Sequence, residues 1–144
     1  MLVRQILKSK ADDAVVTVPP GTSVREAADV LAKRKIGTVV ISEDGQKALG
    51  ILSERDIVRE LAAHGAAVLT EPVDTYMTTK LVTCKLDASA EAVLATMTEK
   101  RFRHMPVVEE GQMVGIITLG DAVKAQMAEL KMEKDALEGM IMGY

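Results

Sequence analysis

The chain contains the stretch Gly50-Ile51-Leu52-Ser53-Glu54-Arg55-Asp56, and the same pattern returns 65 positions later as Gly115-Ile116-Ile117-Thr118-Leu119-Gly120-Asp121. Each stretch has a glycine, two aliphatic residues, a hydroxyl residue and, three positions after the hydroxyl residue, an aspartate. An aliphatic run that ends at a serine or threonine is typical of a strand that leads into a helix. Two such stretches in one chain indicate an internal repeat.

The repeat extends upstream at a nearly constant spacing. Three further matches lie 66 positions apart: Val16-Thr17-Val18 with Val82-Thr83-Cys84, Ser23 with Ser89, and Ile36 with Phe102. The spacing falls to 65 only after Gly45 and Gly111, and one residue deleted from a turn explains the change, because turns tolerate changes of length. The chain therefore carries two copies of one unit.

Each copy predicts the element order β-α-β-β-α. Ser23 with Glu26 three residues later forms a capping box, which predicts a helix start, and Ser89 predicts the matching start in the second copy. The other predicted elements are strands at 14–18 and 81–85, buried strands at 38–42 and 105–109, hairpin partners at 49–52 and 114–117, and helices at 56–63 and 121–127.

These elements predict an α+β fold with two packed repeats. One copy of about 50 residues is too small to bury both sides of its sheet, so we expect two copies to pack with pseudo-two-fold symmetry and a cleft between them. We expect the first repeat, with an N-terminal segment, in residues 1–64 and a linker in residues 65–80. The second repeat follows in residues 81–127, and a helical C-terminal tail in residues 128–144.

The composition disfavours several classes of protein. A net charge of −3 and an aromatic content of 2% argue against nucleic-acid binding. The single cysteine, Cys84, excludes an internal disulfide and a cysteine-based zinc site, and His64 has no second histidine at ligand spacing, so we assign no metal. Because no signal segment or long apolar run is present, we expect a cytoplasmic protein that does not contact a membrane.

With Arg-His-Met-Pro-Val at 103–107 before the second hairpin, these motifs resemble the cystathionine-β-synthase (CBS) domain pair, or Bateman module. The resemblance covers residues 1–127. It is strongest to stand-alone bacterial pairs, which are similar to this chain in Ser-Glu-Arg-Asp-Ile-Val-Arg at 53–59 and Arg-Phe-Arg-His-Met-Pro-Val at 101–107. It implies a regulatory module that binds AMP, ADP, ATP, NAD(H) or S-adenosylmethionine, forms a homodimer and signals to a protein partner.

The resemblance also implies which residues line two ligand clefts, each shared between the copies. Carried over to this sequence, cleft A combines Val82, Thr83, Arg103, His104, Met105 and Pro106 with Ser53, Arg55 and Asp56. Cleft B combines Val16, Thr17, Gly37, Thr38 and Val39 with Thr118 and Asp121. The implied dimer contacts are the helices around Ile57, Val58, Leu61, Val123 and Met127.

The residue types suit such a ligand. An ionised carboxylate, as in Asp56 or Asp121, can accept hydrogen bonds from both vicinal hydroxyls of a ribose. A serine or threonine hydroxyl at a helix start can bind a phosphate together with free backbone N–H groups. Cleft A has Arg103 and His104 where cleft B has Gly37 and Thr38, so we expect cleft A to prefer charged nucleotides.

Two alternatives stay open. Asp56 and Asp121 could each serve only as a helix cap, since aspartate is favoured at helix starts. The whole chain could be a structural or dimerisation module whose clefts are empty, filled by Met105, Arg103 or Arg55. An enzyme is disfavoured, because the sequence has no nucleophile elbow, P-loop, metal motif or carboxylate pair with a base, and we assign no catalytic residue.

Overall fold

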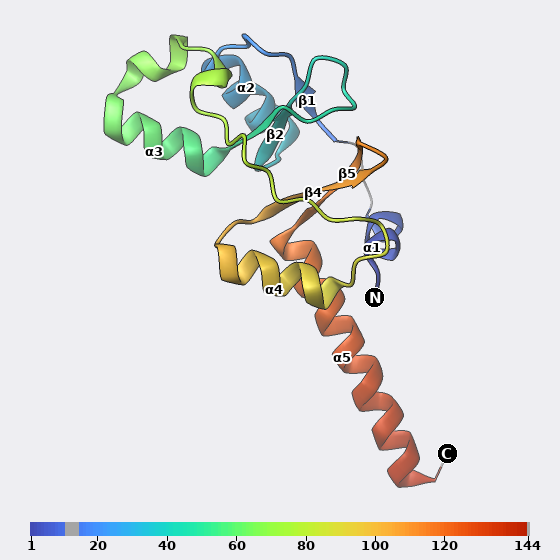
Figure 1. Cartoon of the computed structure of the whole chain (residues 1–144). Coiled ribbons are helices and arrows are strands. Elements are labelled where there is room, and N and C mark those ends of the chain that lie inside the picture. Colours follow the sequence, from blue (N-terminus) through green and yellow to red (C-terminus); the bar gives the residue numbers. More distant parts are fainter. Residues whose placement is uncertain (11–14, 144) are drawn as a thin grey trace. The chain divides into compact units, whose positions relative to one another are not determined.

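The computed structural model describes residues 1–10 and 15–143 as a mixed α+β fold (Figure 1). Its elements are, in chain order, α1 (Val3–Ser9), β1 (Thr17–Val18), α2 (Val24–Arg34), β2 (Thr38–Ile41), β3 (Gly50–Ser53), α3 (Glu54–His64), the 3₁₀ helices η1 (Ala66–Thr70) and η2 (Val73–Thr75), α4 (Ala90–Lys100), β4 (His104–Glu109), β5 (Gln112–Thr118) and α5 (Leu119–Met142). The chain divides into two compact units, which are described separately.

The unit built on the first repeat, unit 2, centres on a three-stranded sheet. Strand β1 runs parallel to β2, with Thr17 opposite Val40, and β2 runs antiparallel to β3, with Thr38 opposite Ser53. Strand β2 is buried along its whole length, as its continuous apolar run predicts. Its core takes side chains from α2, α3 and the sheet, including Val24, Leu31, Val39, Leu52 and Ile57.

The unit built on the second repeat, unit 1, holds α1, α4 and α5, and strand β4 pairs with β5. The prediction of a first strand at 81–85 in this unit is wrong. Among the described bridges, this segment makes a single parallel one, between Cys84 and Val107. Pro106 explains the difference. Its equivalent in the first repeat, Val40, donates its N–H to the Val16 carbonyl at 3.0 Å, whereas proline has no N–H to donate.

The helix starts and ends repeat closely between the two units. Ser23 Oγ accepts from the Glu26 amide at 3.1 Å, and Ser89 Oγ accepts from the Ala92 amide at 3.0 Å. Helices α2 and α4 end at equivalent residues with left-handed backbone, Lys35 and Arg101. The expected serine caps are thus present, although the described bonds include only the serine half of the capping box at Ser23.

The N-terminal segment, expected to belong to the first repeat, packs instead in unit 1 with the second repeat. The Val3 amide donates to the Ala88 carbonyl at 2.8 Å, and Leu2 forms a bridge with Ser89. Helix α1 buries Val3, Ile6 and Leu7. The spacing of these three side chains gives α1 an apolar face, which is the physical reason it is held by this unit.

The segment expected as a linker packs in the same way in unit 2. The Val73 amide donates to the Thr22 carbonyl at 2.8 Å, and Pro72 forms a bridge with Ser23. Val68 and Val73 are fully buried in the core of this unit. Residues 71–80 are therefore the equivalent of residues 1–10, and each of these segments completes the repeat that it does not directly precede in the sequence.

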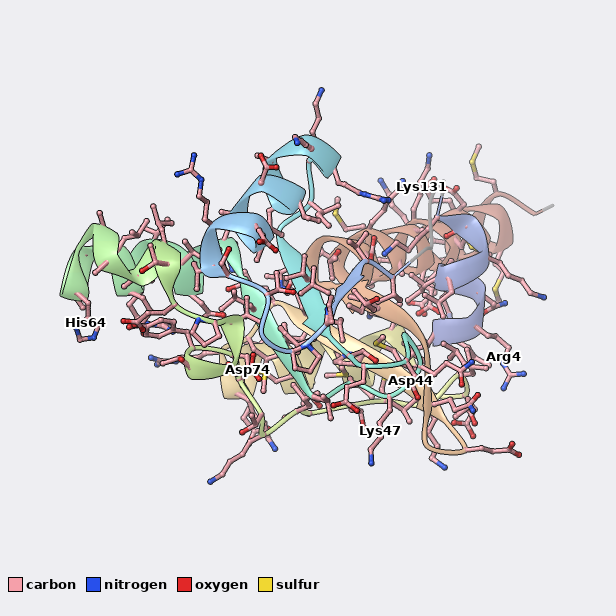
Figure 2. The ribbon with its side chains drawn as sticks, turned by 90° about the horizontal axis from the view of Figure 1, so that it is seen from above. Arg4, Asp44, Lys47, His64, Asp74 and Lys131 are labelled. Atoms are coloured by element: carbon pink, nitrogen blue, oxygen red, sulfur yellow. The ribbon has the colours of Figure 1, made fainter. Side chains whose placement is uncertain are left out.

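The structure also shows how exposed several other residues singled out in the sequence are. His64, to which we assign no metal, lies exposed at the end of α3 (Figure 2). Of the helical positions expected to form a dimer face, Ile57 is buried in the core of unit 2, whereas Val58, Val123 and Met127 are exposed. The expected helices at 121–127 and in the tail form one continuous helix, α5; Tyr144, like residues 11–14, lies outside the described residues.

Glycine is required where the exchanged segments meet the strands. A Cβ atom added at Gly115 would lie 2.8 Å from Cδ2 of Leu7, and one added at Gly50 would lie 2.5 Å from Sδ of Met77. Both distances are closer than van der Waals contact. The glycines of the repeated motif thus give room to the side chain of an exchanged segment.

We expect Gly115→Ala to lower the free energy of unfolding by about 1–3 kcal/mol, because the new methyl group forces Leu7 out of its position. The matched control is Gly120→Ala in the first turn of α5, where the nearest atom, Thr118 Oγ1, is 3.8 Å from the added Cβ. That change should raise stability slightly, since alanine favours a helix. Urea denaturation of the two variants measures the contrast, and equal effects would contradict it.

Candidate functional site

A reciprocal cap joins the hydroxyl residue and the aspartate of the first motif. The Ser53 amide donates to Oδ2 of Asp56 at 2.9 Å, and the Asp56 amide donates to Oγ of Ser53 at 3.2 Å. Arg59 Nη2 donates to the second carboxylate oxygen, Oδ1, at 2.8 Å. The Asp56 side chain is 15% exposed while that of Arg59 is 64% exposed, so solvent weakens this ion pair.

The second motif has the same cap with a different cation. The Thr118 amide donates to Oδ2 of Asp121 at 2.9 Å, and the Asp121 amide donates to Oγ1 of Thr118 at 3.1 Å. Lys10 Nζ lies 2.9 Å from the same Oδ2 atom and also donates to the Ile116 carbonyl at 3.1 Å. The cation on Asp121 therefore comes from the N-terminal segment, not from the helix that carries the aspartate.

The pKa of Asp121 follows from these contacts. Burial by itself raises the pKa of the carboxyl group, but the hydrogen bonds from Thr118 and the Lys10 ammonium outweigh burial and hold the pKa below its usual value. Asp121 is thus an ionised, partly buried carboxylate with two donors on one of its oxygens. A carboxylate has about four acceptor positions, so the cap uses only part of its capacity.

Both aspartates take part in helix capping, since α3 and α5 each begin with a full capping box; whether capping is their only role stays open. This role does not conflict with ligand binding, because the cap fixes the carboxylate at the end of a strand. The Glu54 amide at the start of α3 also donates to the Gly37 carbonyl at 2.9 Å, and the Leu119 amide at the start of α5 donates to the Arg103 carbonyl at 2.8 Å.

Each unit brings together residues that the sequence assigns to different clefts. In unit 2, Gly37, Thr38 and Val39 of cleft B lie beside the Ser53–Asp56 motif of cleft A. Thr38 Oγ1 donates to the Leu52 carbonyl at 3.2 Å. In unit 1, Arg103 of cleft A lies next to the Thr118–Asp121 motif of cleft B. Each predicted cleft draws on both units, so the pairing of residues into clefts stays a prediction.

The residues predicted to line the clefts differ in how far their side chains are exposed to solvent. Val39, Met105 and Pro106 are buried, and so is Thr38. Arg55, Arg103 and Thr83 are exposed. The remaining predicted residues are half-buried: Val16, Thr17, Gly37, Ser53, Asp56, Val82, His104, Thr118 and Asp121. The exposed arginines could therefore contact a ligand phosphate through their side chains, whereas Val39 and Met105 offer mainly backbone groups.

Sequence reasoning missed Lys10 and Arg59. Arg59 stands three residues after Asp56 on one helix, a spacing that signals such a pair. No spacing rule could have found Lys10, because it is 111 residues from Asp121 in the sequence. Among the described residues, no three histidine, cysteine, aspartate or glutamate side chains lie close enough to hold a metal ion. Nor does any described helix combine the length and apolar character needed to cross a membrane.

The sequence model of the CBS domain matches residues 3–63 and 73–128. The chain belongs to the CBS domain family. Among known relatives, it is 32% identical over 122 residues to the CBS domain-containing protein YhcV of Bacillus subtilis, covering 85% of this chain and 86% of that protein. It is 30% identical to the mitochondrial CBS domain-containing protein CBSX3 of Arabidopsis thaliana, over 98% of this chain and 72% of that protein.

Solved structures confirm the CBS-pair fold. The CBS-domain containing protein ATU1752 from Agrobacterium tumefaciens is 42% identical, with a TM-score of 0.83 over 88% of this chain and 99% of that chain. The CBS domain pair of protein MJ0100, in complex with 5′-methylthioadenosine and S-adenosyl-L-methionine, is 28% identical, with a TM-score of 0.76 over 90% of this chain and 98% of that chain. The resemblance drawn from the repeated motif is therefore confirmed, as is the mixed α+β fold with two CBS repeats.

The Lys10–Asp121 pair predicts a pH-dependent loss of stability. At pH 7 we expect Lys10→Met to lower the free energy of unfolding by about 1 kcal/mol, because the ionised carboxylate loses its cation. The Asp121 pKa is lowered in the folded chain, so the contribution of the pair is present above the unfolded pKa and disappears as pH falls through the folded value.

The measurement is urea denaturation of both proteins at pH 7 and at pH 3. Lys8→Met is the matched control, because Lys8 is an exposed lysine of the same segment and its loss should change stability little at either pH. A Lys10→Met effect that is equally large at pH 3 would contradict an origin in the ionised carboxylate.

Proposed function

We propose that this CBS domain pair is a regulatory module that binds an adenosine-containing ligand, catalyses no reaction and passes the binding event to a protein partner as a change of conformation. The observation that supports it is the doubled motif, in which a capped aspartate stands at the end of a strand in each unit. The ligands in the MJ0100 complex both contain adenosine, and their presence in a CBS domain pair supports a ligand of that class.

In this proposal the ribose hydroxyls donate to Asp56 at one site and to Asp121 at the other. Cleft A adds Ser53, Arg55, Val82, Thr83, Arg103, His104, Met105 and Pro106, and cleft B adds Val16, Thr17, Gly37, Thr38, Val39 and Thr118. Both aspartates are fixed by their caps before a ligand arrives, so little side-chain entropy is lost on binding.

The two sites are not equivalent. Arg55 and Arg103 are exposed cations for the phosphates of AMP, ADP, ATP or NAD(H) at cleft A. At cleft B, Lys10 already bonds the Asp121 carboxylate, and a ribose must share that carboxylate with the ammonium group. We therefore place the tighter site for charged nucleotides in cleft A.

The regulatory role needs the two clefts to favour one conformation of the chain or of a homodimer. A ligand shifts such an equilibrium only by its difference in affinity for the two states. A ribose-binding aspartate has no bond to break, which is why we assign no catalysis. Nucleotide hydrolysis by the purified chain that is lost in Asp56→Ala would overturn this part of the proposal.

A thermal-shift screen of AMP, ADP, ATP, NAD, NADH, S-adenosylmethionine and 5′-methylthioadenosine tests the binding role. A ligand at 100 times its dissociation constant stabilises the folded chain by about 2.7 kcal/mol, which should raise Tm by about 5–10 °C. We expect Asp56→Ala and Arg103→Ala to abolish most of the shift from the tighter site, and Asp121→Ala to affect mainly the weaker site.

The control separates a lost ligand contact from a lost helix cap. Ser89→Ala removes the α4 cap and should lower Tm by a similar amount to Asp56→Ala, but it should leave the ligand-induced shift intact. If none of the compounds shifts Tm, the chain is better explained as a structural or dimerisation module with empty clefts. An unchanged ligand shift in Asp56→Ala and in Asp121→Ala would refute the assigned ribose contacts.

A further inference from the structure

Helix α5 has a packed first half and a largely exposed second half. Its first half buries Ala122 and Ala125, and Glu129 forms an ion pair with the N-terminal amino group of Met1. From Leu130 to Met142 every residue except Gly139 is exposed, and in Figure 1 this part extends past α1 and α4 of its own unit. The match to the CBS domain also ends at residue 128. We call residues 130–141 the free half of α5.

The free half carries apolar side chains at heptad spacing. Met127, Leu130, Leu137 and Ile141 fall on one stripe of the helix, and Lys134 takes the remaining position of the repeat. The exposed fractions of Leu130, Leu137 and Ile141 are 56%, 59% and 85%. A helical segment this short is marginal in water without a partner, so the stripe indicates a surface that is covered by another helix.

We propose that the free half of α5 pairs, antiparallel, with the free half of a second copy of this chain. The charges beside the stripe decide against a parallel pair. In a parallel pair, Lys134 would face the partner's Lys134 across the seam, and Glu133 would flank the partner's Glu138. Like charges in those positions oppose association.

One antiparallel register places oppositely charged side chains of the two helices next to each other. With Leu130 opposite the partner's Ile141, Lys134 packs its aliphatic stem against the partner's Leu137. Its ammonium group stays beside Glu138 of its own helix, 3.8 Å away. Lys131, whose position on the chain is shown in Figure 2, then lies beside the partner's Glu138, and the symmetry of the pair makes this contact twice. Shifting the pair by one heptad, with Met127 opposite the partner's Leu137, brings Lys131 against Lys131 and Glu133 against Glu133.

The length of the free half fits the same register. The overlap runs from residue 130 to residue 141 on both chains, a span of about 18 Å at the rise of an α-helix. It begins directly after Glu129, where the contact with Met1 ends. The pairing thus uses the exposed part of the helix and leaves the ion pair between Met1 and Glu129 in place. It is independent of ligand binding, because none of its residues belongs to either proposed cleft.

Sedimentation equilibrium of the whole chain over a range of concentrations tests the pairing. We expect Leu137→Glu to raise the concentration of half-dissociation at least tenfold, because it places a charge in the seam. The matched control is Met132→Glu, since Met132 is exposed on the opposite side of the same helix; it should change the association less than twofold. A wild-type chain that stays monomeric at all concentrations, or equal effects of the two changes, would overturn the proposal.

A charge swap tests the register and direction. Lys131→Glu and Glu138→Lys should each weaken association several-fold, because each creates like-charge contacts with the partner, and the double variant should restore it. In a parallel pair, Glu138→Lys would relieve the repulsion from the partner's Glu133 and strengthen association. Tighter association of Glu138→Lys, or no recovery in the double variant, would therefore refute the antiparallel arrangement. Circular dichroism of each variant confirms that the fold is retained.

Discussion

The reciprocal hydrogen bonds between a hydroxyl residue and an aspartate, at Ser53–Asp56 and Thr118–Asp121, determine how each unit is built and what it offers. The cap satisfies backbone groups that a helix start otherwise leaves unpaired. It also fixes the point at which the strand ends and the helix begins. The carboxylate needed for a ribose is thereby held in place by the same two bonds that stabilise the helix, so fold and proposed binding share one structural cause.

The second constraint is the exchange of segments between the repeats. Residues 1–10 complete the unit of the second repeat, and residues 71–80 complete the unit of the first. The glycines of the motif accommodate Leu7 and Met77 at this junction. The unit of the second repeat thus depends on residues 1–10, which precede the first repeat in the sequence, whereas residues 71–80 directly follow the repeat that they complete.

Residues at constant spacing made most of the fold predictable. The matches between the copies identified the two CBS repeats, the serine caps, the buried strand β2 and the aspartates at the starts of α3 and α5. The exchanged segments were not found, since Leu7 matches Met77 and Ile6 matches Tyr76 only in apolar character, and their spacing of 70 differs from that of the repeat. The absence of a strand at 81–85 could have been predicted from the sequence, because Pro106 stands where the first repeat has Val40 and removes the backbone N–H that would pair with this segment.

The differences between the copies indicate how one unit can change its role while its fold is kept. Asp56 pairs with Arg59 on its own helix, whereas Asp121 pairs with Lys10 from the exchanged segment. The first pair is exposed and weak; the second links the N-terminal segment to the proposed ribose-binding group. In the proposed function, a ribose that donates hydrogen bonds to Asp121 shares this carboxylate with Lys10 of the N-terminal segment. The proposed ribose contact and the position of the N-terminal segment therefore meet at one carboxylate group in the second motif, whereas the cation beside Asp56 belongs to the same helix as the aspartate.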